Sequence, residues 1–334
     1  MIELRPVGTS GIEVAPLALG GNVFGWTADE AMSFRLLDEF VDAGGTMIDT
    51  ADVYSAWAPG HEGGESERVI GAWLRRDPAK RAKVVIATKV GFLDGKIEPA
   101  KAKAYDGKNS GEFVASLHPT AIARGAESSL ERMGIETIDL YYQHRDNDTV
   151  PLEDSLGAFE ELRRAGKIRA TGLSNFEPKR VETALKVAHD NGFDPAVAVQ
   201  GWYNLVARDK FEGPLQDLVT GLGLSFFSFY SLANGFLTGK YRSKDDLGKS
   251  VRGLRNIEYV ESDRGRRVLA ALEQVAGETK APMAAVAIAW TKAQPGVTAP
   301  IASATSEDQL VELLAALTLD LSPAQIALLN DASG

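Results

Sequence analysis

The chain of 334 residues contains no cysteine. This absence excludes disulfide bonds, thiolate metal sites and a cysteine nucleophile, and it fits the reducing cytoplasm in which we expect the protein. The sequence also lacks any run of about 18 apolar residues, so we expect no membrane-spanning helix. Residues 1–5 do not combine a basic stretch with a following apolar segment, so we expect no signal peptide.

Positive charges are outnumbered, because 36 lysines and arginines stand against 46 aspartates and glutamates, a formal net charge of −10. A general affinity for nucleic acid or for an anionic membrane is therefore not expected. A phosphorylated ligand would need a local basic pocket instead. The four histidines have no carboxylates at a convincing metal-ligand spacing, so we expect no metal site.

Hydrophobic residues make up 44% of the chain, which is enough for a sizeable core. Short apolar runs alternate with longer amphipathic segments, as in a parallel sheet with crossover helices. We expect eight strands, at residues 17–20, 46–49, 84–89, 138–142, 168–173, 197–200, 224–228 and 297–301. We expect helices at residues 31–43, 66–75, 120–133, 152–165, 178–190 and 283–292. Eight strands favour a closed (β/α)8 TIM barrel in the α/β class, formed by residues 1–334 as one domain.

Three further segments lie outside this alternation. Residues 4–7 and 12–14 flank a glycine-rich turn, which predicts an N-terminal β-hairpin that plugs the bottom of the barrel. Residues 91–117 and 242–263 are long and polar. Loops of this length inside a compact domain are typical of lids and binding loops, so we expect them at the functional face.

Four polar side chains follow or end three of the predicted strands. Asp49 and Tyr54 follow the second strand, Lys89 ends the third and His144 follows the fourth. Each of these residues taken alone is more often structural than catalytic. Because barrel enzymes place their catalytic residues at the carboxyl ends of strands, the combination predicts an active site.

These four groups suit proton donation to a carbonyl oxygen. A tyrosine has a pKa of about 10, and we expect the Lys89 ammonium to ease release of the Tyr54 proton. Asp49 would keep Lys89 charged and oriented, since a buried unpaired ammonium is costly. His144 would donate to the substrate oxygen or assist the proton relay. No side chain supplies a hydride, so a cofactor must do so.

With these residues in place, the sequence resembles the aldo-keto reductase family over essentially its whole length. Asp49, Tyr54, Lys89 and His144 are similar to that family's catalytic residues. Ser174 and Asn175 resemble the pair that holds the nicotinamide carboxamide, and Gln200 the glutamine that contacts the same amide. The resemblance implies a barrel that binds NADP(H) or NAD(H) without a Rossmann domain, and no Gly-x-Gly-x-x-Gly follows the first strand.

The segment after the seventh strand resembles the family's pyrophosphate loop. Its expected cofactor-binding residues are Tyr230, Ser231, Leu232, Gly235, Leu237, Gly239 and Lys240. Glycines allow close backbone approach to an anion, and the lysine adds a point charge. We expect the ring of Phe229 to stack on the nicotinamide in place of the family's usual tyrosine.

Two further positions depart from the family pattern. In residues 200–203, Gly201 and Trp202 stand where the family more commonly has Pro-Glu or a similar pair. This change puts the indole of Trp202 near the substrate. After the last strand, Ser303, Thr305 and Gln309 are expected at the adenosine end, but no arginine or lysine accompanies them to bind a 2′-phosphate. Arginine is the strong binder of phosphate, so the preference between NADPH and NADH stays open, with Arg252 as a compensating cation.

On the substrate side, Trp26, Trp57 and Trp202 are expected to wall an apolar pocket, together with Tyr230. The substrate is then an aldehyde or ketone, or the corresponding alcohol. Aromatic faces also bind sugar rings, so a sugar-derived carbonyl fits equally well. The physiological direction and the oligomeric state do not follow from the sequence.

Two other functions stay open. One is a cofactor-binding regulatory subunit, which would resemble the β subunits of potassium channels that keep this fold and bind nicotinamide. The other is a barrel isomerase or lyase, in which Lys89 would form a Schiff base with the substrate and no hydride would be transferred. Turnover, and trapping of an imine with borohydride, would separate these from a reductase.

Overall fold

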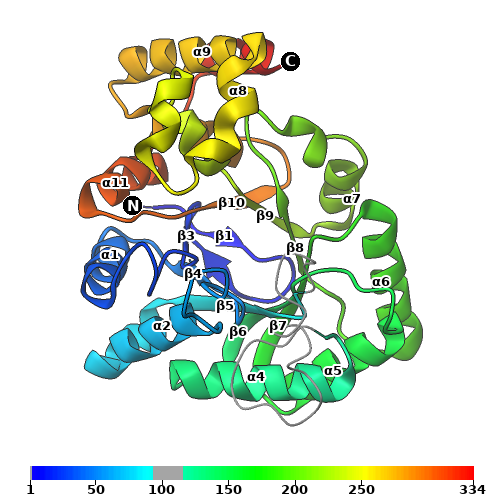
Figure 1. Ribbon diagram of the computed structural model, residues 1–334. Coiled ribbons are helices and arrows are strands. Elements are labelled where there is room, and N and C mark those ends of the chain that lie inside the picture. The colour runs from blue at the N-terminus through cyan, green and yellow to red at the C-terminus, as the bar shows by residue number, and fades with distance from the viewer. Residues whose placement is uncertain (1, 93–115) are drawn as a thin grey trace.

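In the computed structural model, which describes residues 2–92 and 116–334, eight parallel strands close into a barrel surrounded by helices (Figure 1). Around the barrel the strand order is β10-β3-β4-β5-β6-β7-β8-β9. The strands are β3 (Ala18–Gly20), β4 (Met47–Asp49), β5 (Val85–Val90), β6 (Ile138–Gln143), β7 (Ile168–Ser174), β8 (Ala198–Trp202), β9 (Ser225–Phe229) and β10 (Val297–Ala302). This confirms the predicted (β/α)8 barrel, and each strand begins and ends within two residues of its expected position.

The helices are α1 (Glu30–Asp42), α2 (Glu65–Arg76), α4 (Pro119–Met133), α5 (Leu152–Arg164), α6 (Pro178–Asn191), α7 (Pro214–Leu222), α8 (Ile257–Glu261), α9 (Asp263–Thr279), α10 (Met283–Lys292), α11 (Glu307–Leu314) and α12 (Pro323–Ser333). The six predicted helices are present, as α1, α2, α4, α5, α6 and α10, and the structure adds further helices that were not predicted. Local signals set several ends. Asp29 accepts a hydrogen bond from the backbone of Met32 at the start of α1, and Ser322 and Gln325 form a capping box at the start of α12.

A two-stranded hairpin closes the amino-terminal end of the barrel, as expected. Its strands are β1 (Arg5–Pro6) and β2 (Glu13–Val14). Val7, Ile12 and Val14 are buried against residues of the barrel strands, including Met47 and Leu140. Among the described residues, apolar packing seals this end, so we expect a ligand to enter from the opposite end, where the carboxyl ends of the strands lie.

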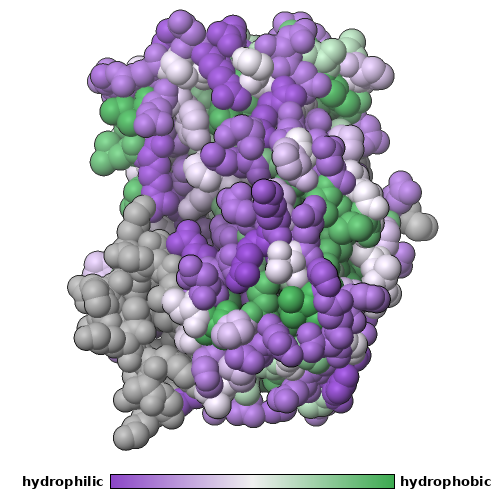
Figure 2. Space-filling view, turned by 90° about the vertical axis from the view of Figure 1, so that its right-hand side faces the viewer, coloured by the Kyte–Doolittle hydropathy of each residue, from purple (hydrophilic) through white to green (hydrophobic). Residues whose placement is uncertain are grey.

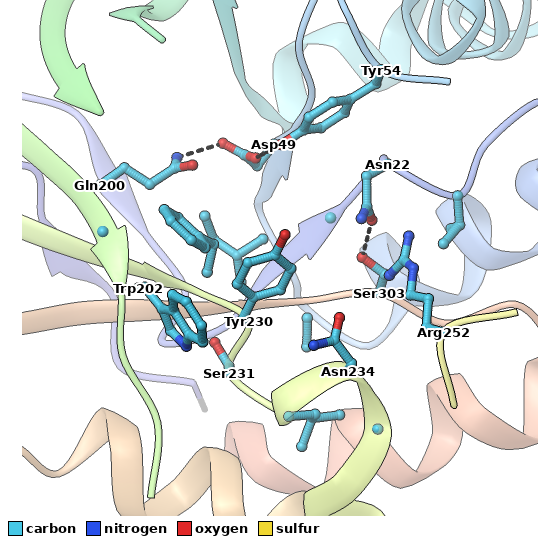
Figure 3. Close-up of a pocket in the computed structure, with 18 of the residues that line it drawn as sticks. Asn22, Asp49, Tyr54, Gln200, Trp202, Tyr230, Ser231, Asn234, Arg252 and Ser303 are labelled. Carbon is cyan, nitrogen blue, oxygen red and sulfur yellow. Dashed lines mark hydrogen bonds between the residues drawn. The ribbon is translucent and has the colours of Figure 1, made fainter. Parts of the chain in front are cut away.

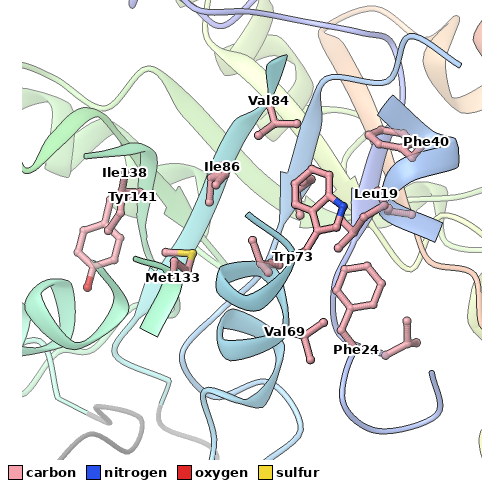
Figure 4. Packing of buried hydrophobic residues seen from close by; sticks show 14 of the residues in the cluster. Leu19, Phe24, Phe40, Val69, Trp73, Val84, Ile86, Met133, Ile138 and Tyr141 are labelled. Carbon is pink, nitrogen blue, oxygen red and sulfur yellow. The ribbon is translucent and has the colours of Figure 1, made fainter. Parts of the chain in front are cut away.

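The outer faces of the strands pack against the helices (Figure 4). Trp73 of α2 is fully buried with Leu19, Phe40 and Ile86, and its indole N–H donates to Asp38 at 2.6 Å. Burial of side chains of this size contributes about 1.5–3 kcal/mol each before the entropy of ordering is subtracted. The helix layer therefore holds the strands, and with them the residues at the strand ends, in fixed positions.

The face of the molecule in Figure 2 is mostly hydrophilic, with hydrophobic side chains in small groups. Among the described residues, every helix is too short or too polar to cross a bilayer.

Of the two long segments predicted as loops, the structure describes residues 242–263 in full but only a few residues of 91–117. Residues 242–263 are not an irregular loop, because they form the short helices η4 (Lys244–Lys249), η5 (Gly253–Asn256) and α8. Ser243 and Asp246 make a capping box that the loop prediction overlooked. Most of residues 91–117 lie outside the described residues.

Candidate active site

A buried ion pair lies where β4 and β5 end. The ammonium of Lys89 donates to Asp49 Oδ1 at 2.6 Å, to the backbone carbonyl of Thr50 at 2.8 Å and to Tyr54 Oη at 3.0 Å. Three oxygens therefore take the three N–H groups of the ammonium. Tyr54 Oη also donates to Asp49 Oδ1, at 3.4 Å. The structure thus brings Asp49, Tyr54 and Lys89 into one cluster.

Alternation along β5 directs Lys89 inward, because neighbouring strand residues point to opposite faces. Thr88 points into the helix layer and donates to Glu67 at 2.6 Å. Arg132 of α4 binds the other oxygen of Glu67, also at 2.6 Å, and both charged groups are buried. This second ion pair anchors the outer face of β5. It therefore fixes the position of the backbone from which the Lys89 side chain extends.

The environment makes Tyr54 a weaker acid than the sequence predicted. Burial and the carboxylate of Asp49 raise the pKa of Tyr54 well above its usual value, and the positive charge of Arg252 opposes them. Burial also lowers the pKa of Lys89, against the effect of Asp49. Loss of water around the phenolate and the negative charge of Asp49 therefore oppose the effect expected of Lys89. Tyr54 stays protonated at neutral pH.

His144 completes the set on the β6 side. Its side chain is 6% exposed, and its ring centroid lies 6.1 Å from that of Tyr54. Burial, Lys89 and Arg145 lower the pKa of His144 well below its ordinary value. The imidazole is therefore neutral at physiological pH and has one N–H to donate.

Amide side chains extend the site to the opposite strands. Asn175 has the unusual φ of 58° and donates to the carbonyl oxygen of His144 at 2.9 Å. Gln200 of β8 donates to Asp49 Oδ2 at 2.8 Å across the mouth of the barrel (Figure 3). Ser174, Asn175 and Gln200 all line the cavity.

The segment after β9 is tightly turned. Tyr230, Ala233 and Asn234 have φ values of 55°, 46° and 54°, and Gly235 follows at 91°. Such backbone costs on the order of 1–3 kcal/mol per non-glycine residue and clusters at functional sites. A Cβ at Gly235 would lie 2.9 Å from Cε of Lys240, so only glycine lets the lysine lie against the turn.

These residues surround one cavity of about 1190 Å³. It is lined by most of the expected residues: Asp49, Tyr54, Trp57, His144, Ser174, Asn175, Gln200, Trp202, Phe229, Tyr230, Ser231, Leu232, Gly235, Lys240, Arg252, Ser303, Thr305 and Gln309. Its basic lining residues are Arg145, Lys210, Lys240, Lys249 and Arg252, and its carboxylates are Asp49, Glu177 and Glu312. The cavity is therefore locally positive in an acidic protein.

Four expected site residues do not line the cavity. Leu237 is fully buried in the core, because the turn directs it inward, and Gly239 ends η3 (Ala233–Thr238). Lys89 lies beneath Asp49 and Tyr54. The ring of Trp26 lies 5.6 Å from that of Trp57, and Trp57 lines the cavity whereas Trp26 does not.

Arg252 closes one side of the cavity. Its guanidinium lies 5.4 Å from the ring of Trp26, a cation–π contact that links η5 to the loop after β3. Trp202 and Tyr230 form a second aromatic contact, with centroids 5.4 Å apart. Tyr230 is 39% exposed and lies centrally in the cavity (Figure 3).

Several residues that line the cavity were not predicted from the sequence. Asn22 accepts a hydrogen bond from Ser303 Oγ at 2.6 Å, which joins the ends of β3 and β10 (Figure 3). Phe92 lies 4.6 Å from the ring of His144, and Arg145 lies 5.3 Å from Phe92. The signal for Asn22 and Arg145 was their place directly after predicted strands, which was the criterion that identified His144.

Within residues 2–92 and 116–334, no group of three or more histidines or carboxylates is placed to hold a metal ion. The fold and the cavity define a barrel protein with its polar cluster at the carboxyl ends of the strands, where barrel enzymes have their active sites.

The chain belongs to the aldo/keto reductase family, whose model matches residues 16–333. The family reduces carbonyl compounds. The chain is 32% identical to "Uncharacterized oxidoreductase YrpG" of Bacillus subtilis (strain 168), over 99% of this chain and 95% of that protein. It is 27% identical to "Versiconal hemiacetal acetate reductase" of Aspergillus parasiticus, over 99% and 96%. It is 29% identical to "Probable voltage-gated potassium channel subunit beta" of Oryza sativa subsp. japonica, over 95% and 91%.

Proposed function

We propose that the protein is an NAD(P)(H)-dependent oxidoreductase that interconverts an aldehyde or ketone with its alcohol, with Tyr54 as the general acid and base. The observation that carries this proposal is the contact of 3.0 Å between Lys89 Nζ and Tyr54 Oη at the floor of a large cavity. It places a protonated phenol beside a positive charge, at the end of the barrel opposite the hairpin.

Tyr54 gives its proton to the carbonyl oxygen as negative charge develops there. An alkoxide is a stronger base than a phenolate, so transfer is favourable even with the raised pKa of Tyr54. Lys89 stabilises the phenolate that remains, and Asp49 holds Lys89 in place. His144, which is neutral, donates its N–H to the same carbonyl oxygen and orients it.

The cofactor supplies the hydride when it is bound. The volume of the cavity, the turn after β9 and the polar side chains at the strand ends all suit a bound dinucleotide. The volume of about 1190 Å³ exceeds the roughly 300–1,000 Å³ of ordinary ligand pockets, as an extended dinucleotide requires. The positive-φ turn at Asn234 and Gly235, with Lys240 against it, suits a diphosphate. Ser174, Asn175 and Gln200 are amide or hydroxyl groups suited to a carboxamide. Tyr230 presents a more exposed ring than Phe229, which supports Tyr230 as the stacking residue.

The substrate side is aromatic. Trp57 is 46% exposed, and Trp202 and Tyr230 lie across the cavity from Tyr54. An apolar or sugar-derived carbonyl compound fits these walls. The Schiff-base alternative finds little support, because the three N–H groups of Lys89 are engaged and its side chain is fully buried.

The test is Tyr54→Phe, with Tyr141→Phe as the matched control. Tyr141 is also buried, but its side chain packs on Phe159 in the helix layer. Tyr54→Phe should lower kcat by about 10²–10⁴-fold, the usual contribution of a general acid, with cofactor affinity nearly unchanged by fluorescence titration. Tyr141→Phe should retain activity. Unchanged turnover in Tyr54→Phe would overturn the assignment. Tight cofactor binding by a wild-type protein without turnover over a broad carbonyl panel would favour a regulatory subunit instead.

A further inference from the structure

The side chain of Gln200 reaches across the whole barrel. Its strand, β8, is four strands away from β4 in the closed ring, which places the two on opposite walls. Even so, Gln200 Nε2 lies 2.8 Å from Asp49 Oδ2, and both side chains are 1–2% exposed (Figure 3). A hydrogen bond to a buried carboxylate is among the strong ones, because the acceptor is charged.

The two oxygens of Asp49 have different partners. Oδ1 accepts from Lys89 and Tyr54, whereas Oδ2 accepts from Gln200. A carboxylate that is held at only one oxygen can rotate about its terminal torsion, which is broad and weakly restricted. The contact from Gln200 restricts this rotation, and so it fixes the plane of the carboxylate relative to Lys89 and Tyr54.

We infer that Gln200 is a positioning residue for proton transfer, and that it acts through Asp49 on Lys89 and Tyr54. The inference rests on the proposed function. A primary amide has two N–H groups and one acceptor oxygen, so one N–H can hold Asp49 while the remaining groups contact a bound carboxamide. The same side chain then joins the cofactor's amide to the proton donor, and its loss lowers kcat as well as cofactor affinity.

The first test is a double-mutant cycle between Gln200→Leu and Asp49→Asn, with kcat measured at saturating cofactor. In the wild-type background, Gln200→Leu should lower kcat by about 10-fold or more, the factor expected from loss of one charge-assisted hydrogen bond. In the Asp49→Asn background the same change should have little further effect. Equal factors in both backgrounds would overturn the inference, because Gln200 would then act without Asp49.

The matched control is Gln143→Leu in the same two backgrounds. Gln143 ends β6 and is as deeply buried, but its amide lies near Ser155 of α5, 3.5 Å away, instead of Asp49. Its effects should be the same in both backgrounds. Urea unfolding of the cofactor-free variants gives a readout without activity, in which Gln200→Leu and Asp49→Asn should be non-additive and Gln143→Leu and Asp49→Asn additive.

The second test is the pH profile of Gln200→Glu. Two carboxylates in hydrogen-bond contact share one proton, because they cannot both ionise easily. At low pH the shared proton replaces the amide hydrogen bond, and kcat should approach that of the wild type. As the pH rises and this proton is lost, kcat of Gln200→Glu should fall by about 10-fold. The pH profile of Gln143→Glu should show no such decrease. A parallel profile for the two variants would overturn the inference. Absence of carbonyl turnover in the wild type would instead overturn the proposed function. The unfolding cycle would still report on the Gln200–Asp49 contact in that case, because it does not depend on activity.

Discussion

Lys89 and Asp49 form an ion pair of 2.6 Å in which the side chains are 0% and 2% exposed. Removal of one partner leaves a buried charge unpaired, which costs about 3–5 kcal/mol. We predict that Lys89→Met and Asp49→Asn each lower the free energy of unfolding by about this amount, and that the double variant loses much less than the sum. Urea denaturation measures all three. Additive losses would show that the pair does not interact as the distance implies.

The burial of His144 makes stability depend on pH. Its pKa is lowered in the folded protein, so the folded state stays neutral while the unfolded chain binds a proton below about pH 6.5. The free energy of unfolding is therefore unaffected by the protonation of His144 above that pH. It decreases as the pH falls below it, because the unfolded chain gains a proton that the folded protein does not bind. We predict that His144→Gln reduces the slope of unfolding free energy against pH by roughly 1.4 kcal/mol per unit between about pH 6 and 4.

Urea unfolding at several pH values measures this slope. His189→Gln is the control for loss of a histidine, because His189 is exposed on α6. Equal slopes for wild type and His144→Gln would contradict the neutral imidazole and its role as a donor.

Thr305 lies at the start of α11 and has no basic neighbour on that helix. Its backbone N–H and hydroxyl donate to Gln309 Oε1 at 3.0 and 3.1 Å, and Glu307 and Asp308 occupy the first turn. Separate fluorescence titrations with NADPH and NADH should therefore give little preference for the phosphorylated cofactor. Thr305→Arg should improve NADPH affinity relative to NADH by roughly 10-fold, because charge-assisted hydrogen bonds contribute about 1.5–3 kcal/mol.

Thr305→Gln controls for the loss of the threonine contacts with a side chain that is uncharged. If Thr305→Arg leaves the ratio of the two dissociation constants at its wild-type value, the adenosine end of the cofactor does not lie at α11.

Arg252 and Trp26 connect two segments that border the cavity. Because the guanidinium lies over the indole ring, we expect it to hold η5 against the loop after β3 and over the bound cofactor. Arg252→Ala should weaken cofactor binding by roughly 5–30-fold, the equivalent of about 1–2 kcal/mol for a partly buried cation. Stopped-flow fluorescence should assign most of the loss to faster dissociation. Arg255→Ala removes an equal charge from an exposed neighbour and should change the rate little.

Much of the fold was predictable because its signals are local. Apolar runs, the glycines and prolines that interrupt them, and capping residues such as Ser322 depend on neighbours within a few positions. The short helices of residues 242–263 were missed, since brief polar helices lack an apolar period. Leu237 and Trp26 do not line the cavity, because a sequence pattern does not say which way a side chain points once the backbone turns.

The sequence by itself determined that polar groups follow the strands, since the alternation fixes where each strand ends. Only the tertiary structure decided how these groups interact. Closure of the barrel sets β8 opposite β4, and so brings Gln200 to Asp49 across 151 residues of chain. Burial then decided the protonation states, raising the pKa of Tyr54 and lowering that of His144. The physical reason is that loss of water and the distance between charges depend on the packed structure, which no local pattern encodes.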